Sequence, residues 1–218
     1  MEKKELRSYS GGQYQPRLRE AQEGQPQSRT IEGYAIVFGV ESRLIVDYWD
    51  AYREIIEPGA VTVEDLKNFD IKMTMYHNRE KILARSYKGK GTLDLVVDEI
   101  GVKYIFEAPN TPDGDTALEL VKRGDLSGSS FAYWTDENSN VSYEKAEDGA
   151  IIRHVKKISE IMDMTIAADP AYMQTSVTAR ELEQVGVMPK ETKPRISKKS
   201  GVLREIERCR RELELMGY

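Results

Sequence analysis

The stretch Ile71-Lys72-Met73-Thr74-Met75-Tyr76-His77 largely alternates apolar and polar side chains and ends on one of the two histidines in the chain. A period of two is typical of a β-strand with one buried face. On that geometry His77 shares a face with Met73 and Met75, so we expect it to point toward the interior. Well downstream, the Gly-Ser cluster GDLSGSSF at residues 124–131 leads into a second β-like stretch. Together they offer the residue types of a serine nucleophile and its base.

A serine hydroxyl is a poor nucleophile at neutral pH and needs a neighbouring base, for which histidine has a suitable pKa. A carboxylate must then orient the imidazole, which directs attention to Glu160 and Asp163 in a later apolar stretch. The order histidine, serine, acid differs from that of the three best-known serine hydrolase arrangements, so a different scaffold is implied.

Each of these signals also has an ordinary structural explanation. Histidines at strand ends are commonly structural, and Gly-Ser clusters commonly form turns. This cluster, however, runs directly into the apolar and aromatic residues 131–134, as the entrance to a strand does. Asp163 stands between Met162 and Met164, where a carboxylate is costly to bury unless it has a partner; the alternative is that this face of the strand is exposed to water.

The composition favours one main domain without nucleic acid or membrane partners. The 218 residues include 32 Lys and Arg against 37 Asp and Glu, for a net charge of -5, and the region expected to fold carries no concentrated basic block. The single cysteine, Cys209, cannot form an intramolecular disulfide, which favours an intracellular setting. No run of about 18 apolar residues occurs, so we expect no membrane span.

The sequence predicts neither a metal nor a cofactor. Its two histidines lie far apart and its one cysteine is remote from both, so no ligand spacing resembles a zinc site. A Gly-rich phosphate-binding loop followed by lysine is also missing from the sequence. A cofactor-independent hydrolase fits these residues best.

Four segments are expected along the chain. Residues 1–30 are rich in Gly, Gln and polar side chains and read as a flexible N-terminal arm, and residues 31–180 form the main domain. Residues 181–200 carry Glu, Lys and Pro and read as a linker. Residues 201–218 predict a C-terminal helix that presents one apolar face. That face consists of Val202, Ile206, Cys209, Leu213 and Met216.

The main domain shows many short β-like stretches and few helices. Turn residues separate these predicted strands and helices. Strands are expected at 31–38, 52–56, 71–77, 91–97, 102–108, through 130 and twice within 151–168, and a short helix at 63–69. A second short helix is introduced by residues 111–115, with acidic residues near its start, runs through 117–121, and ends with Lys122-Arg123 before Gly124 as its stop. The predicted fold class is α+β, a mainly antiparallel, β-barrel-like domain with a few short helices.

Several motifs occur in a specific order between residues 31 and 180. They are Gly33-Tyr34-Ala35 with Phe38, Glu54-Ile55-Ile56-Glu57-Pro58-Gly59-Ala60, Tyr76-His77-Asn78, the cluster at 124–131, and Asp163-Met164-Thr165-Ile166 before Pro170-Ala171-Tyr172. In this order and spacing the chain resembles the tailed-bacteriophage prohead protease family, serine peptidases that mature capsids and are related to herpesvirus assemblins.

The resemblance implies a role for individual residues. It makes His77 the base and Ser130, directly before Phe131, the nucleophile, with Ser129 and Ser127 as neighbours. The family usually has a glutamate where Asp163 stands, and this position is the expected third member.

Two alternatives for the third member remain open at this point. Glu160 would take the place if the strand register differed. His154 would correspond to the second histidine that the herpesvirus relatives use, although its flanking charges suggest a residue that faces solvent.

The resemblance also implies a function. It predicts an endopeptidase that cleaves capsid or scaffold proteins, and itself, through an acyl-enzyme inside the procapsid in the host bacterial cytoplasm. The expected partners are the major capsid protein and its scaffold segment. Self-association is compatible with this. The spacing of its apolar residues, rather than the resemblance, suggests that the C-terminal helix delivers the enzyme to scaffold or capsid. The alternatives are a non-catalytic capsid-assembly or scaffolding protein that retains the fold, and a β-barrel binding module unrelated to viruses.

Overall fold

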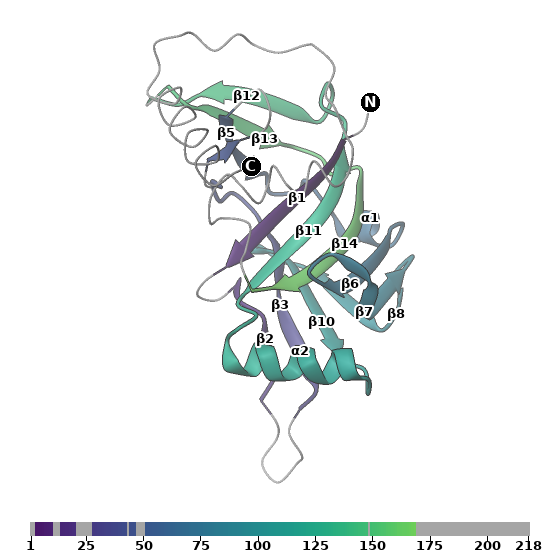
Figure 1. Cartoon of the computed structure of the whole chain (residues 1–218). Helices are drawn as coiled ribbons and strands as arrows, with labels where there is room; N and C mark the ends of the chain where they lie inside the picture. The colour runs from purple at the N-terminus through teal and green to yellow at the C-terminus, as the bar shows by residue number, and fades with distance from the viewer. Residues whose placement is uncertain are drawn as a thin grey trace.

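Three β-sheets and two helices make up the described part of the chain in a computed structural model (Figure 1). The structure describes residues 3–10, 14–20, 28–42, 44–46, 51–147 and 149–168. The predicted linker at 181–200 and the predicted helix at 201–218 lie outside these residues.

The largest sheet has six strands in the order β1-β11-β14-β6-β7-β8. Most neighbours are antiparallel, but β14 runs parallel to β6. In chain order the strands are β1 (Lys3–Ser10), β6 (Asp70–Met75), β7 (Asn78–Tyr87), β8 (Lys90–Gly91), β11 (Gly128–Thr135) and β14 (Glu160–Ala167). In Figure 1, β1, β11 and β14 lie side by side along the length of the molecule.

Two four-stranded sheets flank the large one, in the orders β2-β3-β10-β9 and β12-β13-β5-β4. The second contains another parallel pair, β13 with β5. Their strands are β2 (Arg17–Leu18), β3 (Thr30–Val37), β4 (Ile45–Val46), β5 (Ala51–Ile56), β9 (Leu93–Val97), β10 (Gly101–Glu107), β12 (Val141–Lys145) and β13 (Ile151–Val155).

Local signals fix the two helices. The short helix α1 (Val63–Leu66) begins with a capping box in which Thr62 and Asp65 satisfy each other's backbone amides. The longer helix α2 (Pro112–Arg123) has Thr111 as its N-cap, acidic residues in its first turn and basic residues in its last. Gly124 ends it in the left-handed conformation, with φ of 79°, and the chain turns from there into β11.

The hydrophobic core lies where the inner faces of the sheets meet. Apolar side chains from β3, β10, β6, β11 and β14 are almost completely buried there, among them Ile36, Tyr104, Met73, Phe131 and Met164. Because successive residues of a strand point to opposite faces, these core residues orient their neighbours toward the other face of the sheet. In this way the packing of β6, β11 and β14 determines where the side chains between them point.

The structure confirms a mostly β fold with few helices and corrects two details. The three sheets do not close into a barrel in the described residues, since each has two separate edge strands. In addition, Lys3–Ser10, within the expected flexible arm, is strand β1 and pairs with β11. Sequence patterning missed this strand because its partner is more than a hundred residues away. None of the described helices is both long and apolar enough to cross a membrane.

Candidate active site

Three adjacent strands of the large sheet bring the candidate residues together. Ser130 on β11 lies opposite Thr165 on β14, and Thr165 in turn pairs with Thr74 near the end of β6. Asp163 lies two residues before Thr165 on the same strand, so their side chains share a face. His77 follows β6 directly, which places it at the same end of these strands.

His77 does not belong to a strand, contrary to the prediction for 71–77. β6 ends at Met75 and β7 begins at Asn78, with Met75 and Asn78 paired, so Tyr76 and His77 form a two-residue hairpin turn. Both have φ of 55°, the positive value that type I′ turns require at their two central residues. Asparagine and glycine usually occupy such positions because other side chains are strained there. The backbone strain therefore coincides with the candidate base.

The imidazole of His77 contacts both of its predicted partners. Its Nε2 lies 2.8 Å from Ser130 Oγ, and its Nδ1 is hydrogen-bonded to Asp163 Oδ1. A carboxylate that is ionised can only accept a hydrogen bond, so the proton of a neutral imidazole belongs on Nδ1. Nε2 then accepts the hydrogen bond from the serine hydroxyl.

The site is almost closed to solvent. Asp163 is 1 % exposed and Ser130 is 4 % exposed, while the His77 side chain retains 16 %. The expectation that Asp163 must have a partner is met by His77, and its face of the strand is not wet. Burial strengthens the electrostatic interactions among these groups, because little water is present to screen them.

Thr165 fixes the position of His77 through the backbone. Its hydroxyl accepts a hydrogen bond from the His77 amide at 3.0 Å and donates one to the Thr74 carbonyl oxygen at 2.9 Å. A strained turn keeps one geometry only when its surroundings hold it. Thr165 was part of a quoted motif, but nothing in the local sequence indicated this role, because the bond depends on strand register.

Ser130 differs from the other two serines of its cluster. Ser129 is completely buried, and its hydroxyl is 2.8 Å from Tyr104 OH on β10, on the opposite face of β11. Ser127 precedes the strand and contacts the Ala168 carbonyl oxygen at 3.5 Å. Within the described residues, Ser130 is the serine of this cluster that contacts His77.

The structure separates the two alternative third members from His77. Glu160 is exposed at the start of β14 and pairs in register with Trp134. His154 lies on β13 in a different sheet, where its Nδ1 is 2.6 Å from Glu57 Oε1. It is partly buried, so the expectation that it faces solvent was wrong.

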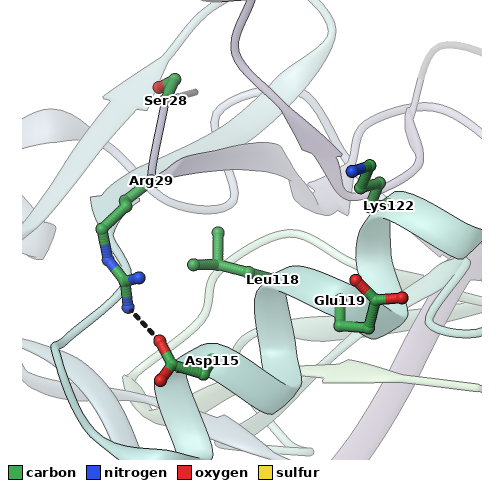
Figure 2. A pocket seen from close by; sticks show the side chains of 6 residues that line it. All are labelled: Ser28, Arg29, Asp115, Leu118, Glu119 and Lys122. Atoms are coloured by element: carbon green, nitrogen blue, oxygen red, sulfur yellow. Dashed lines mark hydrogen bonds and ion pairs between the residues drawn. The ribbon is translucent and has the colours of Figure 1, made fainter. Parts of the chain in front are cut away.

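A separate pocket of about 190 Å³ lies beside α2 and contains none of the triad (Figure 2). Arg29 and Asp115 already form an ion pair of 2.8 Å within its wall. The opposite charges of Arg29 and Asp115 therefore compensate each other. Because the pocket is lined by none of His77, Ser130 and Asp163, it is not the candidate active site. Its lining residues are Ser28, Arg29, Asp115, Leu118, Glu119 and Lys122.

Comparison with known families matches the chain to the model of the caudovirus prohead serine protease over residues 16–188. The chain belongs to this family. The matched segment contains His77, Ser130 and Asp163. Membership assigns the protein a protease role in bacteriophage capsid maturation.

No curated protein matches the chain. Among solved structures, the capsid assembly protease gp21 of bacteriophage T4 matches with a TM-score of 0.46 and 11 % sequence identity. The match covers 76 % of this chain and 98 % of the T4 chain.

We predict that Tyr76→Gly stabilises the protein by about 0.5–1 kcal/mol, because glycine adopts positive φ without steric cost. Tyr76 is half exposed, so little packing is lost. Urea unfolding of the full chain measures the effect. Tyr87→Gly, which removes a similarly exposed tyrosine from the end of β7, should lower stability instead; a loss of stability in both variants would contradict strain at the turn.

We predict that Thr165→Val lowers the turnover number roughly tenfold to a hundredfold with little change in KM, because the His77 amide loses its acceptor and the imidazole shifts. Thr165→Ser should restore most of the rate. Peptide-cleavage kinetics provide the measurement. Thr116→Val, which removes an exposed hydroxyl bonded to Pro112 on α2, is the control and should leave the rate unchanged. A normal rate in Thr165→Val would show that this bond does not position the base.

Proposed function

We propose that the protein is a serine endopeptidase that acts through an acyl-enzyme, with Ser130 as nucleophile, His77 as general base and acid, and Asp163 as the orienting carboxylate. The observation that carries this proposal is the single imidazole bonded through one ring nitrogen to Ser130 and through the other to Asp163. This is the geometry by which a serine triad is recognised on unrelated folds.

In the proposed mechanism, Ser130 Oγ attacks the scissile carbonyl carbon while His77 Nε2 accepts its proton. The imidazolium that forms is stabilised by Asp163, which is buried and accepts from Nδ1. His77 then gives the proton to the leaving amine, and the acyl group stays on Ser130. Water, activated by the same histidine, hydrolyses the ester and regenerates the hydroxyl.

The proposed substrates are proteins of the phage precursor shell. Family membership places the protease role in the prohead, and the proposal extends this to the scaffold segment of the major capsid protein and to the enzyme's own polypeptide. A closed triad suits an enzyme that must not cleave indiscriminately before assembly, since Ser130 is 4 % exposed. The site would operate inside the procapsid, in the host cytoplasm, without a metal or cofactor.

Co-expression with the major capsid protein of the same phage tests this function. We predict that the wild type produces shortened capsid protein, or shortened copies of itself, and that Ser130→Ala abolishes both because the nucleophile is gone. Mass spectrometry of the fragments identifies the junctions. Ser127→Ala is the matched control and should cleave normally. Intact proteins in every sample would instead favour the non-catalytic scaffolding role.

A further inference from the structure

The strand β1 covers the edge of the sheet beside the proposed nucleophile. It pairs antiparallel with β11 along its whole length (Figure 1). Ser8 lies opposite Ser130 in the backbone register. Within the described residues, β1 is an edge strand and β11 is its neighbour in the sheet. An extended peptide that added to β11 would have to take this place, since β-strand addition uses the backbone hydrogen bonds of a free edge.

One side chain of β1 is anchored in the interior. Arg7 is 7 % exposed, and its guanidinium forms a two-pronged ion pair with Glu54 on β5: Nε lies 2.5 Å from Oε1 and Nη2 lies 2.8 Å from Oε2. Nη2 also donates to Tyr52 OH at 3.2 Å, and the guanidinium carbon lies 5.7 Å from the centre of the Tyr133 ring. Carboxylate, hydroxyl and aromatic ring are the groups that recognise arginine specifically.

The carboxylate of Glu54 depends on this cation. Burial alone would raise the pKa of Glu54, but the charges of Arg7 and Arg153 outweigh it and hold the pKa below its ordinary value. Arg153 is shared, because it also binds Glu137 with Nη2 2.7 Å from Oε2. If Arg7 left, Glu54 would keep Arg153 and the Tyr133 hydroxyl as partners but would lose its two-pronged ion pair. Glu137, in contrast, is 47 % exposed and can be solvated by water. A buried charge without sufficient compensation is costly, so the vacated position would favour another cation.

The residues that bind Arg7 lie inside the segment that matches the family model, whereas β1 lies before it. The family match begins at residue 16, after β1, whereas Glu54, Tyr52 and Tyr133 all lie within it. The binding site for the Arg7 side chain is therefore built from the segment that matches the protease family model. The strand that supplies Arg7 precedes that segment. Ser130, on the strand with which β1 pairs, is 4 % exposed in this arrangement.

We propose that Glu54, Tyr52 and Tyr133 form an arginine-binding subsite for an extended peptide paired with β11, and that β1 occupies it through Arg7 as an autoinhibitory strand. The inference rests on the proposed protease function and specifies its substrates. A substrate strand that carries arginine at the position equivalent to Arg7 replaces both the backbone pairing and the buried cation. Substrate binds only those molecules in which the edge of β11 is free. The apparent affinity is therefore the intrinsic affinity multiplied by that fraction.

Arg7→Ala in the full chain tests the inhibitory role. Loss of the ion pair loosens β1, so we expect kcat/KM for a quenched peptide that contains the identified cleavage junction to rise on the order of tenfold or more. Arg7→Lys keeps the charge but not the two-pronged geometry and should give a smaller rise. Arg17→Ala removes another arginine ion pair, in which exposed Arg17 binds Glu32, and should leave kcat/KM unchanged.

A synthetic peptide with the β1 sequence KKELRSYS distinguishes inhibition from a purely structural role. Added to the Arg7→Ala protein, it should lower cleavage, and a matched peptide with alanine in place of its arginine should have at least a tenfold weaker effect. If β1 only stabilises the fold, Arg7→Ala lowers cleavage and the peptide restores it. That result, or no effect of the variant and the peptide, would overturn the proposal.

Binding separates failure of this inference from failure of the protease function. Fluorescence polarisation of labelled KKELRSYS with the double variant Arg7→Ala, Ser130→Ala requires no catalysis. If no protein cleaves but the peptide binds in an arginine-dependent way, the subsite stands and the protease proposal fails. If Ser130-dependent cleavage occurs but arginine makes no difference to binding, the subsite is wrong and the protease proposal stands.

Discussion

The contact of one imidazole with a hydroxyl and a carboxylate depends on a two-residue turn. The β6–β7 connection has no room for a flexible loop, so Tyr76 and His77 both take positive φ and the His77 side chain is carried across the ends of β11 and β14. The hydrogen bond from the His77 amide to Thr165 ties this turn to the strand that bears Asp163. Backbone strain and side-chain geometry are thus maintained by the same neighbour, as expected where the surrounding structure holds a strained turn in place.

Strand register supplies the second constraint. Ser130 faces His77 while Ser129, one residue earlier, faces the core and contacts Tyr104. Because the side-chain period of a strand is two, a slip of β11 by one residue would exchange these serines, and a slip of β14 would turn Asp163 away from the imidazole. The buried aromatic residues Phe131 and Tyr133, whose rings stack 5.2 Å apart, oppose such a slip, since it would remove them from the hydrophobic core in which they pack. The core thereby selects which serine is presented.

Local signals in the sequence predicted much of the fold, and long-range pairings limited the rest. The caps of α2 and the alternation in β3, β5 and β10 are encoded within a few residues, and these elements lie where they were expected. β1 and the open arrangement of the sheets depend on partners far away in the chain. The contacts of His77 with Ser130 and Asp163 agree with the residues chosen by resemblance, but the register that sets Glu160 apart could not be read from composition. The turn at His77 was missed because neither Tyr76 nor His77 is typical of positive φ.

Labelling with a fluorophosphonate, followed by peptide mapping, tests the central contact most directly, because such reagents modify a serine only when a base activates it. The account predicts one adduct, on Ser130, which forms in the wild type and in Glu160→Gln and is lost or greatly slowed in His77→Ala and Asp163→Asn. An adduct on Ser129 or Ser127, or equal labelling of Ser130 in the wild type and in His77→Ala, would contradict it.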